Sequence, residues 1–289
     1  MKNIILRAFC ALAFLLIFIS CSTAPRNPGD IYFLRTQAEQ GIEAANREAA
    51  KGNFEIALSL LTDYKRSAIL VDDPSLIIRT SIARGNVLFS MNRADEAFAE
   101  WDGAIVEAER LGNNELLSVA RIFKARGNLL TSRVPAQTIL DEVVRESANI
   151  RVNKLYIALS WQVRGMAQSS LGLFTEAEAS IRQSLNIHTS ERTLENASYD
   201  WYTIASIRSL AGNISGSLEA LETSIGLDRR IENSWGLASS YRAMGDVYRR
   251  TGRQQDALEA YRRARAIFTA MMSNEGEVAE IDRRIRSLN

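Results

Sequence analysis

The chain has 289 residues, of which 46% are hydrophobic and 24% are charged. Its 35 basic residues face 34 acidic ones, and this near balance gives no reason to expect a nucleic-acid partner or a polybasic membrane contact. A single histidine excludes a multi-histidine metal site.

The chain begins with the features of an export signal. Lys2 and Arg7 precede an apolar run over residues 8–19, and Ser20-Cys21 follows. A basic start and a short apolar core are typical of a secretory signal, and about twelve apolar residues are too few to cross a bilayer core of ~30 Å as a helix. Residues 1–20 are therefore predicted to be a signal peptide.

This segment resembles a bacterial lipoprotein signal, in which the cysteine is lipidated and becomes the new N-terminus. The resemblance implies that Cys21 anchors the protein in the bacterial cell envelope, and Ser22 in place of aspartate favours the periplasmic face of the outer membrane. An uncleaved anchor and simple secretion are the alternatives. Cys10 would leave with the signal, so the mature chain would have no internal disulfide. Residues 21–30, with two prolines, are predicted to form an extended tether.

Small residues recur along the rest of the chain at a fixed period. Ala57, Ala97, Ala177, Ser217 and Ala257 lie 40 residues apart, with a double step of 80 in the middle. Twelve residues before each of them stands another small residue, in the order Ala45, Gly85, Gly165, Ala205 and Gly245. A period in this range predicts a repeat array, whose units pack on their neighbours and present long concave binding surfaces.

The clearest unit indicates why small residues are needed. Helical periodicity runs up to Leu171, Gly172 breaks it, and it resumes at Phe174. Two antiparallel helices joined by so short a turn must pack closely, and Gly165 on the first and Ala177 on the second let their backbones approach. The bulk around this crossing comes from Trp161, Phe174 and Ile181.

The unit resembles the tetratricopeptide repeat (TPR), whose pattern is a Trp or Leu, a Gly or Ala, a Gly with an aromatic residue, and an Ala. Further copies have Trp201, Ala205, Gly212, Ser217 and Leu221; Tyr241, Gly245, Gly252, Ala257 and Tyr261; Gly85, Ala97, Trp101 and Ala104; and Ala45, Gly52, Phe54, Ala57 and Leu61. The resemblance implies an all-α fold, a right-handed superhelix (α-solenoid) of about six helix-turn-helix repeats over residues 31–273. An apolar stripe predicts a C-terminal capping helix within residues 274–289.

One unit departs from the period. Ala125-Arg-Gly127 repeats Ala83-Arg-Gly85 at a spacing of 42, which places Gly127 at the crossing of the third repeat. The turn that follows, residues 131–135, lacks the glycine and the aromatic residue. The next repeat is expected to restore the phase, because Gly165 follows Gly127 by 38 residues.

In the TPR family the first helix of each repeat lines the concave groove, which implies a partner-binding face here. The residue after each crossing is then Asn46, Asn86, Asn128, Met166, Ser206 and Asp246. Neighbouring groove positions hold Arg79, Ile82, Arg121, Lys124, Gln162, Tyr199, Tyr202 and Arg242. In peptide-binding TPRs an asparagine after the crossing both donates to and accepts from the peptide backbone. The alternative is that these asparagines cap helices or pack locally.

Residues that could carry chemistry are few. His188 lies near the end of a predicted helix, where we expect a structural role beside the terminal carbonyls. The sequence has no Walker loop, HExxH, CxxC or Gly-rich dinucleotide motif, so we expect no catalytic residue, metal ion or cofactor. The Arg pairs at 249–250, 262–263 and 283–284 alternate with acidic residues, which is typical of a solvated helix face. The core is expected to include Trp101, Trp161 and Trp201.

These features predict a non-catalytic scaffold or adaptor lipoprotein that binds a protein or peptide partner in a cell-envelope complex. Two other functions stay open. The first is an accessory subunit of a periplasmic solute-uptake system, in which the superhelix encloses a ligand cavity. The second is an envelope enzyme with a reactive serine or an acid pair in a pocket.

Overall fold

The structure, a computed structural model, describes residues 30–271 and 275–288. The predicted signal peptide, the lipidation site Cys21 and most of the tether lie outside these residues. The described part consists of helices and has no strand. The helices are α2 (Asp30–Ala50), α3 (Phe54–Leu70), α4 (Pro74–Ser90), α5 (Ala94–Leu111), α6 (Asn114–Leu130), α7 (Ala136–Ser147), α8 (Lys154–Ser170), α9 (Phe174–Ser190), α10 (Leu194–Leu210), α11 (Ile214–Arg230), α12 (Ser234–Arg250), α13 (Gln254–Ala270) and α14 (Glu275–Arg286).

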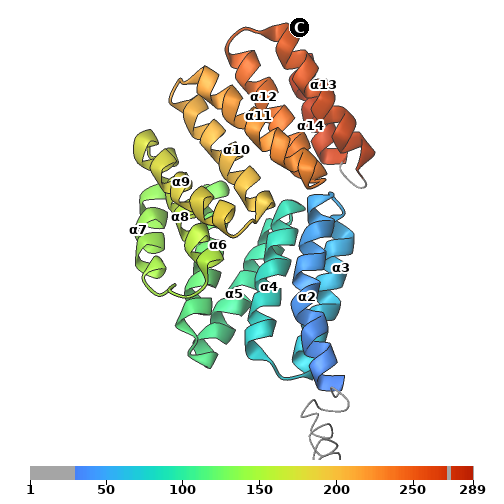
Figure 1. The fold of residues 1–289 in the computed structure, drawn as a ribbon, viewed down its shortest axis with the longest axis vertical. Coiled ribbons are helices and arrows are strands. Elements are labelled where there is room, and N and C mark those ends of the chain that lie inside the picture. The colour runs from blue at the N-terminus through green and yellow to red at the C-terminus, as the bar shows by residue number, and fades with distance from the viewer. Residues whose placement is uncertain (1–29, 272–274, 289) are drawn as a thin grey trace, which may run out of the picture.

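Consecutive helices form six antiparallel pairs that stack into a right-handed superhelix, and α14 follows the last pair (Figure 1). This confirms the predicted all-α solenoid. We call α2, α4, α6, α8, α10 and α12 the first helices of repeats one to six, and their partners the second helices. The superhelix also turns back on itself, because α12 of repeat six contacts α2 of repeat one. No helix of the described part is long and apolar enough to span a bilayer.

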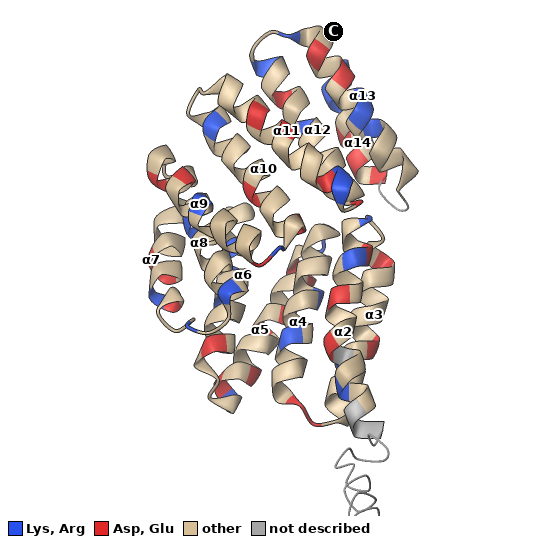
Figure 2. Cartoon of the chain, in the orientation of Figure 1, with Lys and Arg blue, Asp and Glu red and all other residues tan. Residues whose placement is uncertain are grey.

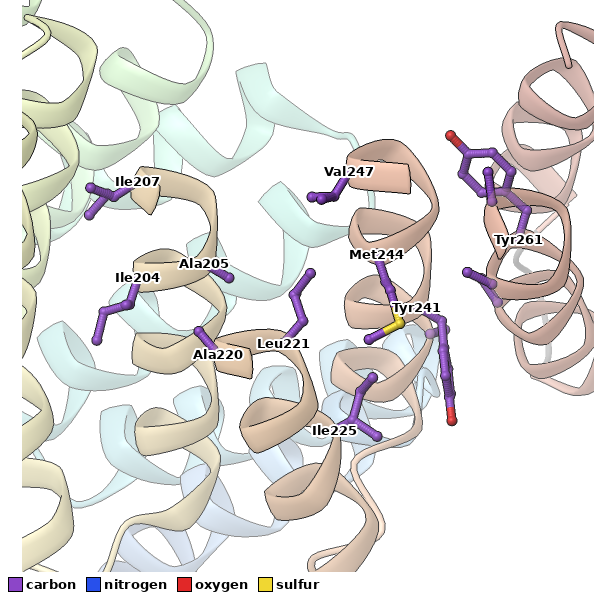
Figure 3. Close-up of a cluster of buried hydrophobic side chains, with 14 of the residues drawn as sticks. Ile204, Ala205, Ile207, Ala220, Leu221, Ile225, Tyr241, Met244, Val247 and Tyr261 are labelled. Atoms are coloured by element: carbon purple, nitrogen blue, oxygen red, sulfur yellow. The ribbon is translucent and has the colours of Figure 1, made fainter. Parts of the chain in front are cut away.

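The helices of each pair cross at small residues, as the sequence indicates. A Cβ atom added to Gly165 would lie 2.7 Å from Ile181 Cδ1 and 2.9 Å from the backbone oxygen of Ala177. A Cβ atom on Gly245 would lie 2.5 Å from the ring of Tyr261. Because no larger side chain fits, these positions fix how closely the helices pack. Figure 3 shows the apolar side chains that fill the space between the crossings in repeats five and six.

The turn within each repeat ends the first helix with one residue in the left-handed backbone region. These residues are Gly52, Asn92, Ser132, Gly172, Gly212 and Gly252, at a constant spacing of 40. A left-handed residue satisfies the last carbonyls of a helix and normally requires glycine. Ser132 adopts a φ of 53° although it is not glycine. The third repeat therefore has the same left-handed turn as the others, without the glycine that marks this turn in most of them.

The predicted slip of two residues in the third repeat is wrong. The first helices α4, α6 and α8 begin at Pro74, Asn114 and Lys154, a constant spacing of 40. The third crossing residue is therefore Ala125, which is 1% exposed, and Gly127 instead makes room for the indole of Trp101. The irregularity lies in α7, which has 12 residues where the other second helices have 17 or 18, and which starts late after the N-cap Pro135.

The tryptophans differ in their environments. Trp101 is fully buried, with Gly85 on one side and Gly127 on the other. Trp161 and Trp201 are only half-buried, so the expectation that all three lie in the core is wrong for these two. Trp161 and Trp201 lie on first helices and are partly exposed to solvent. Trp101 lies on the second helix α5, between the first helices α4 and α6. Trp235 on α12 packs edge-on against Phe54 of α3 at 4.8 Å and against Phe268 of α13 at 5.3 Å between ring centroids.

The C-terminal helix α14 packs its apolar stripe on α13, and Ile281 is fully buried there. Its charged side chains pair with one another and with α12 and α13: Arg284 Nη1 lies 2.6 Å from Glu280 Oε1, and Arg265 Nε lies 2.6 Å from Asp282 Oδ1. On α13, Arg263 Nη2 lies 2.5 Å from Glu259 Oε1. Figure 2 shows basic (blue) and acidic (red) residues interleaved along the helices, as expected for solvated faces.

Candidate functional site

The constant period of 40 defines one face along the first helices. On each first helix, the residue directly after the crossing lies on the same side as the residues four and seven positions before it. We call the surface formed by these residues the first-helix face. The residues after the crossings are Asn46, Asn86, Arg126, Met166, Ser206 and Asp246. Arg126 thus stands where the sequence placed Asn128, because the predicted register of the third repeat was two residues off.

The same correction removes Arg121 and Lys124 from this face. Arg121 Nη2 lies 2.8 Å from Glu109 Oε1 and its Nη1 lies 3.4 Å from Glu146 Oε1, so it bridges α5 and α7. Lys124 Nζ lies 2.5 Å from Asp102 Oδ1 on α5. Both positive charges are neutralised by carboxylates of the second helices and are turned toward them.

Three other predicted groove residues lie on the first-helix face but are already engaged. Ile82 is 5% exposed and belongs to the apolar core. Gln162 is also buried and donates a hydrogen bond from Nε2 to Asp200 Oδ1 at 2.8 Å. Arg242 forms an ion pair with Glu277 of the capping helix. These side chains hold repeats together and are not free to meet a partner.

Four predicted residues remain accessible. Asn46 and Arg79 are exposed, and Tyr199 stacks on Tyr202 with 6.1 Å between ring centroids and 22° between ring planes. Tyr199 keeps 37% of its surface exposed, yet burial raises the pKa of its phenol.

Side chains of helices two repeats apart lie near one another on this face. Burial raises the pKa of Tyr156 on α8, and the Arg79 guanidinium of α4 lies close enough to offset part of the rise. Arg126 of α6 has the same effect on the phenol of Tyr199 on α10. Such contacts skip a whole repeat, so they identify the inner, concave side of the superhelix. Sequence reasoning missed Arg126 and Tyr156; the constant spacing of 40 through Ala125 would have revealed Arg126.

One cavity adjoins this surface, and another lies at the ends of the array. One, of about 230 Å³, lies between α10, α11 and α12, and its walls include Tyr202, Ser206 and Asp246 of the first-helix face. The other, of about 830 Å³, lies where the ends of the array meet. Its walls come from the turns at residues 52–56 and 89–93, from Trp235, and from α14.

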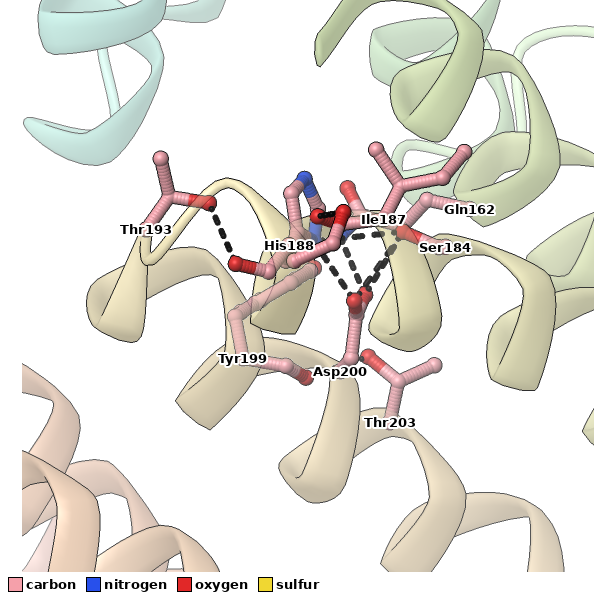
Figure 4. A network of polar contacts seen from close by, with 9 residues as sticks. Gln162, Ser184, Ile187, His188, Thr193, Tyr199, Asp200 and Thr203 are labelled. Atoms are coloured by element: carbon pink, nitrogen blue, oxygen red, sulfur yellow. Dashed lines mark hydrogen bonds and ion pairs between the residues drawn. The ribbon is translucent and has the colours of Figure 1, made fainter. Parts of the chain in front are cut away.

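His188 belongs to a buried polar cluster between repeats four and five (Figure 4). It lies in the last turn of α9 as predicted, but its partner is a carboxylate: Nδ1 is 2.6 Å from Asp200 Oδ2. Ser184 Oγ approaches the same nitrogen at 3.3 Å. A serine nucleophile needs the opposite ring nitrogen as its base, and all three side chains are buried, so this is not the geometry of a catalytic triad. The cluster joins α9 to α10.

The described residues contain no group of three or more His, Cys, Asp or Glu side chains placed to hold a metal ion. The first-helix face combines aromatic rings, amides and a guanidinium, which suit the backbone and side chains of a polypeptide.

Comparisons with known proteins identify the repeat. Residues 195–270 match the family model described as tetratricopeptide repeat. Among solved structures, a Rap protein complexed with Competence and Sporulation Factor superposes with a TM-score of 0.59 at 16% identity, covering 87% of this chain and 74% of that one. BtubC (BKLC) from P. vanneervenii gives a TM-score of 0.51 at 15% identity, covering 83% and 92%. No curated protein sequence matches the chain.

Fold and repeat together define an α-solenoid of paired helices. Repeats five and six are tetratricopeptide repeats by sequence, and the preceding repeats share their helix geometry.

Proposed function

We propose that this protein is a non-catalytic scaffold that binds an extended peptide segment of a partner protein on the first-helix face. The observation that carries the proposal is the grouping of Arg126 with the stacked Tyr199 and Tyr202, from two different repeats, on the concave side. Half-buried tyrosines and arginines are the side chains that most often dominate the energy of protein interfaces. The similar fold of a Rap protein with a bound factor supports the same use of the superhelix.

We further propose that the scaffold is attached to the bacterial cell envelope through lipid on Cys21. The basic start, the short apolar run and the cysteine directly after it support this. The anchored domain would then hold its partner at the periplasmic side of a membrane, with the outer membrane favoured by Ser22. Its partner would belong to an assembly of the envelope.

The test is capture of partners by the full-length lipoprotein from envelope extracts, followed by affinity measurements on variants. Tyr199→Ala with Tyr202→Ala should weaken binding by roughly tenfold or more, because both rings lose their contact area. Val106→Ala, on the exposed surface of the second helix α5, is the control and should bind as the wild type does. The proposal fails if the control variant loses the partner while the double tyrosine variant keeps it.

A second candidate function is favoured by the cavity of about 830 Å³ between the array ends. Phe54, Phe89 and Trp235 contribute aromatic walls, and Glu55, Arg93 and Glu277 contribute charges. A small solute could occupy such a space, as in an accessory subunit of a solute-uptake system. Native mass spectrometry of protein purified from the envelope would reveal a retained small molecule if this function is correct.

A further inference from the structure

One edge of the array carries exposed apolar side chains over its first three repeats and the start of the fourth. Because the helices of each pair are antiparallel, the first helices begin and the second helices end at the same edge. We call the part formed by the start of α2 and by the links at residues 71–73, 112–113 and 148–153 the linker edge. The start of α2 and the first two links lie at the bottom of Figure 1. The large apolar side chains exposed at this edge are Phe33, Ile69, Leu70, Leu111, Val152 and Leu155.

The parts of the linker edge adjoin one another. The first helices that begin there contact one another in order, α2 with α4, α4 with α6 and α6 with α8. Arg35 of α2 forms an ion pair with Asp73 in the link between α3 and α4. The backbone N–H of Val152 donates a hydrogen bond to Glu115 Oε1 at 3.4 Å, which places the last link beside the start of α6. The exposed apolar side chains therefore follow a single edge of the array.

Val152 is the most exposed large apolar side chain of the described residues, at 84%. It lies in a link of six residues, whereas the links before α4 and α6 have three and two. This link is long because the irregular helix α7 ends early, at Ser147. Phe33 and Leu70 are also well exposed, at 64% and 69%. Exposed apolar side chains that gather on one part of a protein surface are typical of an interaction site for another apolar surface.

The length of the tether indicates which surface covers this edge. Cys21 is separated by nine residue steps from Asp30, where α2 begins, and nine steps span no more than about 30 Å when fully extended. The opposite edge lies farther away by the length of a 17-residue helix, about 25 Å. Lipid on Cys21 would therefore hold the linker edge next to the bilayer. At this range the effective concentration is on the order of millimolar, so weak apolar contacts are sufficient.

We propose that the linker edge is a membrane-docking surface, which inserts its apolar side chains into the lipid interface around Cys21. The inference rests on the proposed lipid attachment and adds a second contact with the membrane. Two basic side chains at this edge are already paired, because Arg110 Nη2 lies 2.5 Å from Glu107 Oε1 and Lys154 Nζ lies 2.7 Å from Glu191 Oε1. Docking therefore relies on apolar contacts and should persist at high salt, which screens exposed charges. The first-helix face, along the sides of the helices, stays open to a partner.

The test measures whether the linker edge reaches the acyl chains. Full-length lipoprotein is reconstituted into vesicles of phosphatidylethanolamine and phosphatidylglycerol, with or without bromine on the acyl chains. A bimane label on Val152→Cys is quenched when bromine is in reach. The same label on Leu210→Cys, a position 55% exposed at the opposite edge, is the control and should not be quenched. We expect bromine to remove roughly half of the Val152→Cys emission or more, because docked apolar side chains reach about 5–10 Å into the interface.

A second pair of variants separates docking from mere proximity to the bilayer. In the labelled Val152→Cys protein, Phe33→Ser with Leu70→Ser should lower the quenching by roughly twofold, because less apolar surface is buried in lipid. Leu171→Ser with Leu173→Ser, an equal change at the opposite edge, should leave it unchanged. Far-UV circular dichroism confirms that each variant is folded.

The outcomes distinguish docking from anchoring. If the protein floats with the vesicles but bromine quenches the two labelled positions equally, docking is wrong while the lipid anchor stands. The same holds if the two serine pairs have equal effects on the quenching. If the protein does not float with the vesicles, the proposed attachment fails and docking fails with it.

Discussion

Asp228 Oδ1 accepts a hydrogen bond from Asn233 Nδ2 at 2.8 Å, in a buried site between α11 and α12. Burial raises the pKa of the Asp228 carboxyl to about 6, although hydrogen bonds from Ser198, Asn233 and Ser224 favour the charged form. The site lies 40 residues after His188, so two successive repeats place an ionisable side chain at the same buried position.

The first prediction concerns pH. Because the folded pKa of Asp228 lies above the unfolded value of about 3.9, its stabilising contribution is present below about pH 4 and is lost as pH rises through 6. At pH 8 we expect Asp228→Asn to be more stable than wild type by up to about 3 kcal/mol, and this difference should vanish near pH 4. Urea unfolding of both proteins between pH 4 and pH 8 measures this difference in the free energy of unfolding. A difference that does not change with pH would show that the carboxyl titrates normally.

The second prediction compares two exposed glycines with open space around their Cβ positions. Gly172 has a φ of 77° in the turn of repeat four, and Gly103 lies inside α5. Gly172→Ala should destabilise by about 1–2 kcal/mol because alanine is strained in the left-handed region. Gly103→Ala should stabilise by about 0.5–1 kcal/mol because alanine loses less backbone entropy in a helix. The midpoint of thermal unfolding should therefore fall below that of the wild type for Gly172→Ala and rise above it for Gly103→Ala.

The third prediction concerns the crossing in repeat four. Gly165→Ala would place a methyl group 2.7 Å from Ile181 Cδ1, so the helices must separate, at a cost of about 1–3 kcal/mol. Gly226→Ala on α11, where the space around the Cβ position is open, is the matched control. Equal unfolding midpoints for the two variants would mean that the helices can move apart freely and would contradict the close crossing.

The fourth prediction tests the contact between the two ends of the array. Trp235→Ala removes the indole that packs between Phe54 and Phe268. The packing contact between α3 and repeat six should therefore be lost. Small-angle X-ray scattering should detect an increased radius of gyration with unchanged helix content. Trp161→Ala, which removes another half-buried indole from the middle of the array, serves as the control and should leave the overall dimensions as they are.

The fifth prediction concerns the anchor. The protein should incorporate labelled fatty acid and partition into detergent, and Cys21→Ser should remain unprocessed and unlabelled. Export without lipid would instead yield a soluble, cleaved form. Absence of label from the wild type would rule out the lipoprotein assignment without affecting the fold.

The sequence alone determined the architecture of this protein. A period of 40 in small residues predicts paired helices, because close crossings exclude large side chains wherever they recur. The same argument placed Gly165 and Ala177 at a crossing, and the left-handed turn glycines share the period. The repeat family could be identified because these constraints are local and act identically in each unit.

The tertiary structure decided the register of the third repeat and hence its contribution to the binding face. Two nearby small residues, Ala125 and Gly127, both fit the pattern, and in the structure the helix starts and the position of Trp101 show that Ala125 lies at the crossing. A shift of two residues turns a helix by about 200°, so it exchanges one face for the other. Arg121 and Lys124 are thereby paired with carboxylates on α5 and α7, and Arg126 takes the position after the crossing on the concave side. Pairing of this kind depends on residues distant in sequence, which is why only the folded chain decided it.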